Sequence, residues 1–101
     1  TRDFIYIDDI IESIYLAINR KKSVGEIINI GTGNPTKIKD LANFIIKIYN
    51  KDIFTKHEPP KIGDIRESYA DITKAKKILG FEPKCSLYEG LKNVCQKGMY
   101  Q

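Results

Sequence analysis

The segment IINIGTGNPTKIKDL, residues 27–41, decides the fold class of this 101-residue chain. A short apolar run ends at Gly31, Thr32 and Gly33, and a polar turn then leads into residues with helical periodicity. The order strand, glycine turn, helix is typical of an α/β domain, and it is also the order of a dinucleotide-binding loop. Two explanations of the glycines must therefore be compared, a cofactor loop and a plain strand-to-helix turn.

The glycine turn departs from the dinucleotide fingerprint G-x-G-x-x-G. Thr36 stands where the third glycine is needed for close packing of helix on strand, and Pro35 lies beside it. The fingerprint also needs an acidic residue that ends the second strand, about 20 residues later. Asp52 has roughly that spacing but precedes the candidate strand. A tight turn explains two glycines equally well, so we expect no cofactor contact here.

The remaining sequence predicts a small α/β domain of mixed order in one piece, residues 1–101. Alternating and β-branched runs predict short strands at residues 2–7, 26–30, 52–56 and 68–70. Apolar residues at helical spacing predict helices from residue 10 to 20, 36 to 49, 71 to 80, and from 86 onward. The expected caps are Asp8 or Asp9, Thr36, Asp71 and a Ser86–Glu89 capping box, with Gly80 as a helix end. In the first helix the apolar stripe comprises Ile10, Ile11, Ile14, Ala17 and Ile18.

Composition restricts the classes of function. The chain is 42% hydrophobic and 30% charged, with no apolar run near the ~20 residues that span a bilayer and no secretory start, so we expect a cytoplasmic protein without membrane contact. The net charge of +4 is spread along the chain, and no aromatic ladder accompanies the basic residues. We therefore expect a solvated lysine-rich surface and no nucleic-acid interface. Because the first residue is Thr and not Met, we also expect a piece of a longer polypeptide.

The reactive side chains predict no metal or catalytic site. His57 is the only histidine and has no cysteine near it in the sequence. Cys85 and Cys95 are expected to be reduced thiols, because helical rise would separate them by ~14 Å, beyond the ~7 Å that a disulfide tolerates. Tyr88 and Lys92 have the i, i+4 spacing of a catalytic pair, but they follow a capping box with no glycine-loop strand before them. We expect a surface pair there.

Anion recognition is the chemistry that the remaining charges favour. Arg2 begins a predicted strand, while Lys61 and Arg66 lie around Asp64 in an irregular stretch with two prolines. A guanidinium and an ammonium together can clamp a diphosphate, and a carboxylate can accept hydrogen bonds from ribose or sugar hydroxyls. A merely solvated loop explains the same charges, and composition and spacing leave both alternatives open.

Three ordered segments resemble a known family: TRDFIYIDDI (residues 1–10), GEIINIGTGNPTKIKDL (25–41) and PPKIGDIRESYADITKAKKILGFEPKCSLYEGLK (59–92). They resemble the C-terminal part of nucleotide-sugar epimerases and dehydratases, which are extended short-chain dehydrogenase/reductases (SDRs), with UDP-glucose and UDP-N-acetylglucosamine 4-epimerases closest. The resemblance implies a small mixed α/β substrate-binding lobe whose Rossmann core is absent from this chain. Alternatives are the same lobe of a dTDP-glucose 4,6-dehydratase or UDP-glucuronate decarboxylase, and a stand-alone non-catalytic binding module.

The resemblance also implies what binds where in the whole enzyme. NAD and the catalytic Tyr-x-x-x-Lys pair belong to the missing Rossmann domain, so no catalytic, cofactor-binding or metal-binding residue is expected in this chain. The expected substrate is a UDP-sugar, the full-length enzyme is expected to be a homodimer, and the isolated chain is expected to be inactive. The glycine turn becomes a structural connection within the substrate lobe. The isolated lobe is either monomeric or exposes the apolar face that meets its partner domain.

Site roles follow from the resemblance residue by residue. Arg2 matches the arginine that contacts the substrate pyrophosphate, and Asp64 matches the aspartate near the ribose in an R-x-G-D motif. Lys61 replaces the arginine of that motif, which retains the charge but loses the bidentate fork.

Three further positions match the family less specifically. Phe4 and Tyr6 either contact the substrate or pack in the lobe. Arg66 either approaches the ligand or pairs with a neighbouring carboxylate.

Overall fold

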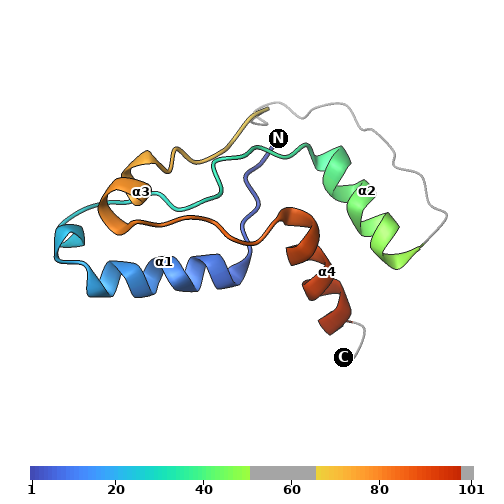
Figure 1. Cartoon of the computed structure of the whole chain (residues 1–101). Coiled ribbons are helices and arrows are strands. Elements are labelled where there is room, and N and C mark those ends of the chain that lie inside the picture. The colour runs from blue at the N-terminus through green and yellow to red at the C-terminus, as the bar shows by residue number, and fades with distance from the viewer. Residues whose placement is uncertain (51–65, 99–101) are drawn as a thin grey trace.

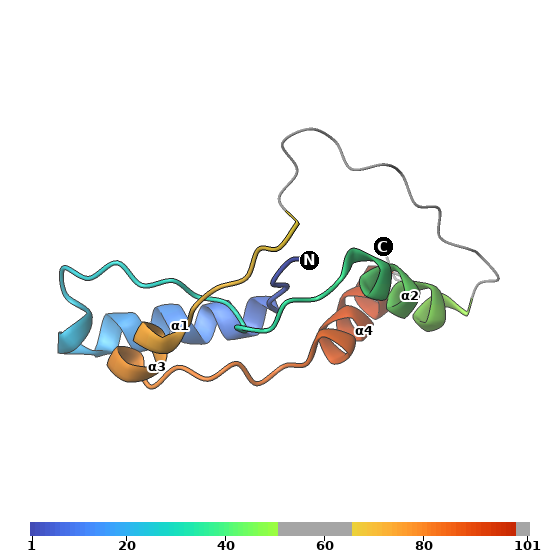
Figure 2. The ribbon, with the colours of Figure 1, turned by 90° about the horizontal axis from the view of Figure 1, so that it is seen from above.

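The structure is a computed structural model that describes residues 1–50 and 66–98 (Figure 1). Its helices are α1 (Ile7–Asn19), the short 3-10 helix η1 (Lys21–Ser23), α2 (Ile38–Tyr49), α3 (Thr73–Leu79) and α4 (Leu87–Gly98). One group contains α1, η1 and α3 in mutual contact, and α2 packs on α4 as a second group. Extended segments run between the groups, and the views in Figures 1 and 2 show an elongated arrangement, with principal extents of 50, 38 and 19 Å.

The predicted strands at residues 2–7, 26–30 and 68–70 are wrong for the described residues. These segments are mostly extended, but they form no ladder, and residue 7 already begins α1. The β-pairing that the structure gives these segments is one antiparallel bridge, in which Arg2 and Thr36 exchange N–H···O bonds of 2.9 and 2.7 Å. A strand needs a hydrogen-bonded neighbour along its length, which a β-branched run cannot supply by itself. The predicted strand at 52–56 lies outside the described residues.

The four predicted helices are confirmed, with differences at their caps. Asp71 accepts hydrogen bonds from the backbone N–H of Thr73 (3.0 Å) and its hydroxyl (2.6 Å), and Gly80 ends α3 in the left-handed region at φ 66°. The Ser86 hydroxyl accepts the N–H of Glu89 at 3.2 Å, which is the first half of the predicted capping box. Thr36 does not cap α2, which begins at residue 38 after a Lys37 cap without a side-chain bond.

The core lies between α3 and the extended segments. It is centred on Ile72, Ala75, Leu79 and Phe81, of which Phe81 and Leu79 are almost completely buried. Partly buried residues from the other segments surround it: Ile5, Leu16, Ala17, Ile28, Ile30, Ala70 and Ile78. Both cysteines are free, as expected. None of the helices within the described ranges is both long enough and apolar enough to cross a membrane.

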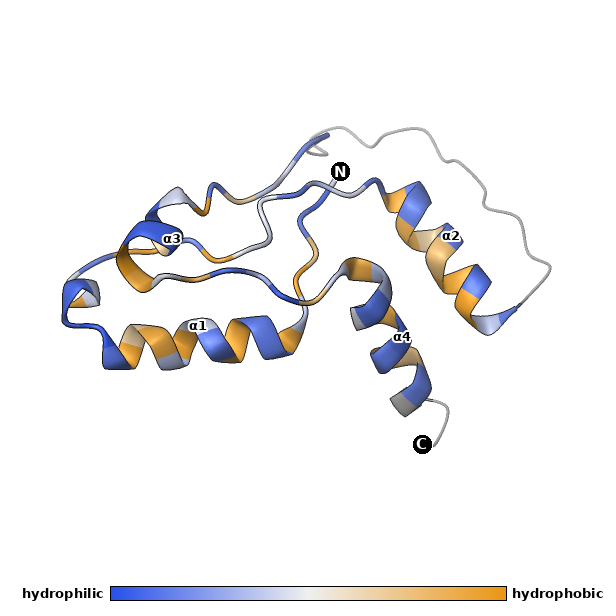
Figure 3. Ribbon diagram, in the orientation of Figure 1, coloured by the Kyte–Doolittle hydropathy of each residue, from blue (hydrophilic) through white to orange (hydrophobic). Residues whose placement is uncertain are grey.

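The first helix carries polar side chains on its inner face, contrary to the amphipathic pattern. Asp9 and Ser13 are each only 3% exposed, and of the predicted apolar stripe Ala17 packs against the core, whereas Ile11, Ile14 and Ile18 are more than half exposed. The reason is that the Asp9 carboxylate accepts the backbone N–H groups of residues 84 and 85, both at 3.1 Å, so this face must turn inward. Neither Asp8 nor Asp9 caps the helix; Tyr6 is the N-cap residue. Figure 3 shows the apolar residues recurring along the length of α1.

Candidate functional site

The side chain of Asp3 joins three segments that are distant in sequence. Its carboxylate accepts the backbone N–H of Thr32 at 3.0 and 3.1 Å, the N–H of Gly33 at 2.9 Å and the N–H of Ala70 at 3.1 Å. The Thr32 hydroxyl donates to the same carboxylate at 2.5 Å. One short side chain thus holds these segments together without a β-ladder.

Both glycines of the turn are required by this geometry, for different reasons. A Cβ on Gly31 would lie 2.6 Å from the Asp3 Oδ2 atom and 2.7 Å from the Ala70 Cβ atom, which is closer than real contacts allow. Gly33 has a φ of +78°, a left-handed conformation that L side chains rarely adopt. The turn therefore passes against Asp3 and residue 70 at a distance that only glycine permits.

The hydrogen bonds change the acidity of Asp3. Partial burial raises the pKa of its carboxyl group, but the bonds from Thr32, Ala70 and Gly33 together outweigh that effect and hold the pKa below the ordinary value of 3.8. The side chain is therefore an anion at neutral pH. The donors of the glycine turn face this internal anion.

A cavity of about 530 Å³ opens beside Asp3. It is lined by Arg2, Asp3, Phe4, Asn29, Ile30, Ser68, Tyr69, Ala70 and Asp71. Arg2 is half-buried there; its backbone pairs with Thr36, and its Nη1 donates to the Thr1 carbonyl at 2.7 Å. We call this space the Arg2 cavity. Two of the six predicted site residues, Arg2 and Phe4, lie on it.

Arg66 lies at the same end of the molecule through its backbone. Its carbonyl accepts a hydrogen bond from the Thr1 ammonium, and the N–H of Ser68 donates to the Thr1 carbonyl at 3.1 Å. The Arg66 side chain is exposed and does not line the Arg2 cavity. Lys61 and Asp64, the other two charged candidates, lie outside the described residues, as does His57.

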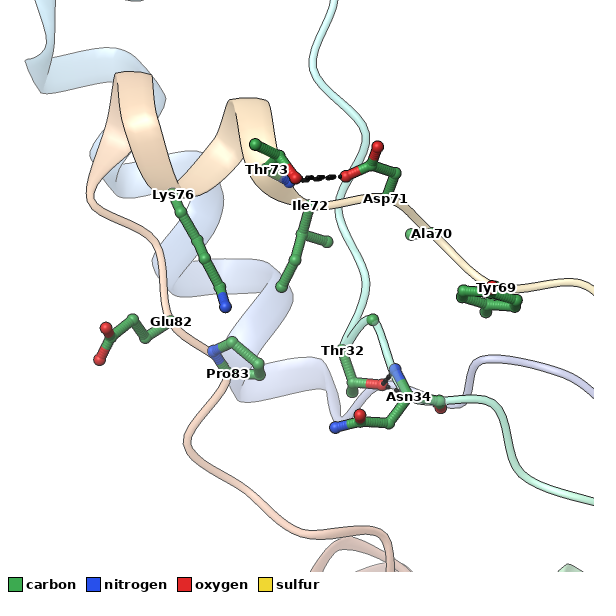
Figure 4. A pocket seen from close by; sticks show the side chains of 11 residues that line it. Thr32, Asn34, Tyr69, Ala70, Asp71, Ile72, Thr73, Lys76, Glu82 and Pro83 are labelled. Carbon is green, nitrogen blue, oxygen red and sulfur yellow. Dashed lines mark hydrogen bonds between the residues drawn. The ribbon is translucent and has the colours of Figure 1, made fainter.

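A second cavity, of about 610 Å³, shares residues 69–71 with the Arg2 cavity (Figure 4). Its wall combines the glycine turn with α3 and the segment after it, and Tyr69, Ala70 and Asp71 line both cavities. In Figure 4 the Lys76 side chain extends beside Ile72 toward Pro83. Residues 69–71 therefore belong to the walls of both cavities, and the bond from Ala70 to Asp3 fixes their position.

The aromatic candidates lie in different surroundings. Phe4 lines both the Arg2 cavity and an apolar cavity of about 160 Å³ beside α4, whereas Tyr6 lines the apolar cavity and not the Arg2 cavity. A Cβ on Gly90 would approach the Tyr6 ring to 3.0 Å, so Tyr6 packs closely against α4. These contacts favour the packing alternative for Tyr6, whereas the position of Phe4 between the two cavities fits both packing and ligand contact.

Tyr88, the first residue of the Tyr–Lys pair in the last helix, packs between helices. Its ring makes an edge contact with Phe44, with centroids 5.7 Å apart, and the Lys47 ammonium lies 5.8 Å from its centroid. Lys92 is exposed. These contacts join α2 to α4 and support the non-catalytic interpretation of the pair.

NAD, which the resemblance implies for the whole enzyme, does not fit the glycine turn. Backbone N–H groups of a cofactor loop must point at the phosphates, but those of Thr32 and Gly33 point at the Asp3 carboxylate. A phosphate placed there would meet a negative charge. Within residues 1–50 and 66–98 there is also no cluster of three or more His, Cys, Asp or Glu side chains that could hold a metal ion.

Sequence reasoning missed Asp3, Asn29 and Tyr69 at this site. Asp3 could have been found, because an aspartate inside a predicted strand is unfavourable and requires a reason. Asn29 and Tyr69 had no such signal, since polar and aromatic residues are common at exposed strand positions. They are found only once the segments are placed side by side.

Comparison with known proteins supplies the remaining information. The family model for GDP-mannose 4,6 dehydratase matches residues 1–94. A UDP-glucuronate 4-epimerase of Thermodesulfobacterium geofontis is 39% identical over 93 residues, which is 90% of this chain and 28% of that protein. UDP-glucuronic acid decarboxylase 5 of Arabidopsis thaliana is 35% identical over 91 residues, again 90% of this chain and 26% of the relative. The chain thus spans less than a third of the length of these relatives.

Two solved structures show the same fold at substantial identity. The UDP-glucose 4-epimerase of Thermotoga maritima with UDP-glucose has a TM-score of 0.83 and 39% identity, covering 96% of this chain and 32% of that chain. The UDP-glucuronic acid 4-epimerase of Bacillus cereus, in complex with UDP-glucuronic acid and NAD, has a TM-score of 0.80 and 35% identity, covering 97% and 32%.

Proposed function

The chain belongs to the GDP-mannose 4,6 dehydratase family, and from this membership we propose that it is the substrate-binding portion of an NAD-dependent UDP-hexose 4-epimerase. The sequence relatives and structural neighbours are enzymes that act on nucleotide sugars. The proposed ligand of this portion is the nucleotide diphosphate of the substrate. A cytoplasmic location and a homodimeric whole enzyme belong to the same proposal.

The observation that carries the proposal is the Arg2 cavity. Its volume of about 530 Å³ falls within the roughly 300–1,000 Å³ of small-molecule sites. A half-buried guanidinium lies on its wall, together with the polar side chains of Asn29, Ser68 and Tyr69. A guanidinium recognises phosphate oxygens through paired N–H donors, and amide and hydroxyl groups suit ribose and sugar hydroxyls. Phe4 adds an aromatic surface on the same cavity.

The role of this portion is binding and positioning. An enzyme uses contacts with the non-reacting part of its substrate to orient the reacting part. The family chemistry relies on NAD as a hydride carrier, and the N–H groups of the glycine turn already donate to Asp3. The isolated chain should therefore bind a nucleotide diphosphate without catalysing epimerisation.

The exposed face of α1 fits the same proposal. Ile7, Ile11, Ile14 and Ile18 form a stripe at spacings of four, three and four residues, and each is more than half exposed. Full burial of such a side chain contributes about 1.5–3 kcal/mol, so covering the exposed part of all four contributes about 4–7 kcal/mol. We propose that the part of the enzyme absent from this chain covers the stripe, as the expected partner-domain face.

The proposal is tested by amide-shift NMR titration of the chain with UDP, dTDP and NAD in parallel. We expect shifts with UDP around Arg2, Asn29 and Tyr69, and no response to NAD. An Arg2→Ala variant should weaken UDP binding about tenfold or more, corresponding to loss of about 1.4 kcal/mol or more. Arg20→Ala is the matched control, since Arg20 is an exposed arginine between α1 and η1 and should bind UDP as before. Shifts at Gly31 and Gly33 with NAD would contradict the proposal.

Three alternatives can be distinguished from the epimerase. The decarboxylase relative favours UDP-glucuronate as a second candidate substrate, and tighter binding of UDP-glucuronic acid than of UDP-glucose would support that candidate. Tighter binding of dTDP than of UDP would favour the dehydratase. A stand-alone binding module is distinguished by the encoding reading frame. If the frame continues upstream into a glycine-rich strand–helix unit, the chain is part of an enzyme.

A further inference from the structure

One carboxylate connects the two walls of the Arg2 cavity. Residues 2–4 and residues 68–71 line it from separate parts of the sequence, beside Asn29 and Ile30, and the bond from Ala70 to Asp3 joins these two walls. The same carboxylate holds the glycine turn through Thr32 and Gly33. Further hydrogen bonds join the same parts of the chain: the Ser68 N–H donates to the Thr1 carbonyl, and the Thr1 ammonium and hydroxyl donate to the Arg66 carbonyl.

Arg2 precedes Asp3 in an extended segment. Successive side chains in extended backbone leave on opposite faces, so fixing one side chain also fixes the direction of its neighbour. Asp3 is anchored by donors from two other segments, and the Arg2 backbone is paired with Thr36 just after the turn that Asp3 holds. The Asp3 carboxylate therefore helps to fix the backbone position from which the Arg2 side chain leaves.

We propose that Asp3 is a positioning residue for nucleotide-diphosphate binding: through the glycine turn and residue 70 it sets the place of Arg2 on the cavity wall. The proposal rests on the proposed function of the Arg2 cavity. It assigns the carboxylate a role beyond stability, since loss of its bonds would displace the guanidinium even in a folded chain.

Asp9 provides a matched comparison. It is also a carboxylate that accepts backbone N–H groups from a distant segment, those of Lys84 and Cys85, both at 3.1 Å. It is more deeply buried, at 3% exposure, and it does not line the Arg2 cavity. Removing either charge should reduce stability, but only Asp3 should affect the ligand.

The experiment compares Asp3→Asn, Asp9→Asn and Thr32→Val with the unsubstituted chain. UDP dissociation constants are measured by calorimetry at a temperature where circular dichroism shows each variant to be folded. We expect at least a tenfold weakening for Asp3→Asn, and a change below twofold for Asp9→Asn despite its lower unfolding midpoint. Thr32→Val removes one donor to Asp3 from a residue that does not line the Arg2 cavity, and it should weaken binding about threefold.

The Thr32→Val variant also separates positioning from direct contact, because Asp3 itself lines the cavity. If Asp3→Asn fails to fold, the Thr32→Val result decides, and an unchanged UDP affinity overturns the proposal. An unchanged affinity in Asp3→Asn, or an equal loss in Asp9→Asn, also overturns it.

Hydrogen exchange of the Arg2 and Thr36 amides tests the positioning role of Asp3 separately from the proposed UDP-binding function of the Arg2 cavity. If the unsubstituted chain does not bind UDP, the proposed function fails for this chain, and exchange alone then tests the positioning. Faster exchange of both amides in Asp3→Asn, or in Thr32→Val where Asp3→Asn does not fold, supports a positional role for Asp3. Unchanged exchange in the folded variant overturns it.

Discussion

Substituting Gly31 by alanine tests the close packing at the glycine turn most directly. The added Cβ would lie 2.6 Å from the Asp3 Oδ2 atom and 2.7 Å from the Ala70 Cβ atom, so the carboxylate and residue 70 must separate from the turn. We expect at least two of the bonds to Asp3 to be lost. Hydrogen bonds to charged groups contribute about 1.5–3 kcal/mol each, and because Asp3 is only half-buried the lower figure applies. The expected loss in the free energy of unfolding is about 3 kcal/mol.

Gly25→Ala is the control for this substitution. Gly25 has a φ of +74°, and a Cβ atom added there would have no neighbouring atom within 4 Å, so alanine meets a backbone penalty without a steric one. That penalty is roughly 1–2 kcal/mol. Urea unfolding followed by circular dichroism at pH 7 measures both variants. A chain of this length has a free energy of unfolding of about 5–15 kcal/mol, so losses of this size leave the variants folded and can be told apart. Equal losses, or a larger loss in Gly25→Ala, would refute the close contact at Gly31.

Three further predictions concern acidity, the core and the exposed helix face. The folded-state pKa of Asp3 is lowered, so its contribution to stability is fully present above the ordinary pKa of 3.8 and is lost as the pH falls toward the folded-state value. The free energy of unfolding, measured as a function of pH, should fall in this acid range. The fall should be smaller in Asp3→Asn, which has no carboxyl group to protonate at this position. Phe81→Ala, at a fully buried position, should cost about 3–5 kcal/mol in urea unfolding, and a cost below 1 kcal/mol would contradict its place in the core. Replacing Ile11 and Ile18 by glutamine should change the free energy of unfolding of the isolated chain by less than about 1 kcal/mol in total. The same replacement should reduce the binding of an apolar dye. A loss of stability above about 2 kcal/mol would show that the α1 face already packs within the chain.

The helices could be predicted from the sequence because their signals are local. Helical spacing, the aspartate before α3, the glycine after it and the serine before α4 each act within one turn of chain. Arg2 and Phe4 could be placed at a site only through family resemblance. Their meeting with Tyr69 depends on contacts between residues more than 60 positions apart, which no local pattern reports.

The strand predictions failed because a local pattern cannot specify a partner. The residues at 2–6, 26–30 and 68–70 have the composition of strands, and much of this backbone is extended. The N–H group of residue 70 in the predicted strand at 68–70, and those of residues 32 and 33 in the turn after residues 26–30, instead donate to a side chain, that of Asp3. A carboxylate can thus hold extended segments together in place of a sheet, at the cost of depending on its own ionisation.

A second carboxylate that accepts backbone N–H groups from another segment, that of Asp9, explains why the isoleucines of α1 face outward. Asp9 must reach the N–H groups of residues 84 and 85, and this fixes the rotation of the helix about its axis. With Asp9 and Ser13 turned inward, the isoleucines at 7, 11, 14 and 18 have no position except the outer face. An exposed stripe of this kind is unfavourable in an isolated domain, and it fits the proposal above that another part of the enzyme covers it. Because two backbone N–H groups specify the rotation, the orientation of the stripe is built into this chain before any partner covers it.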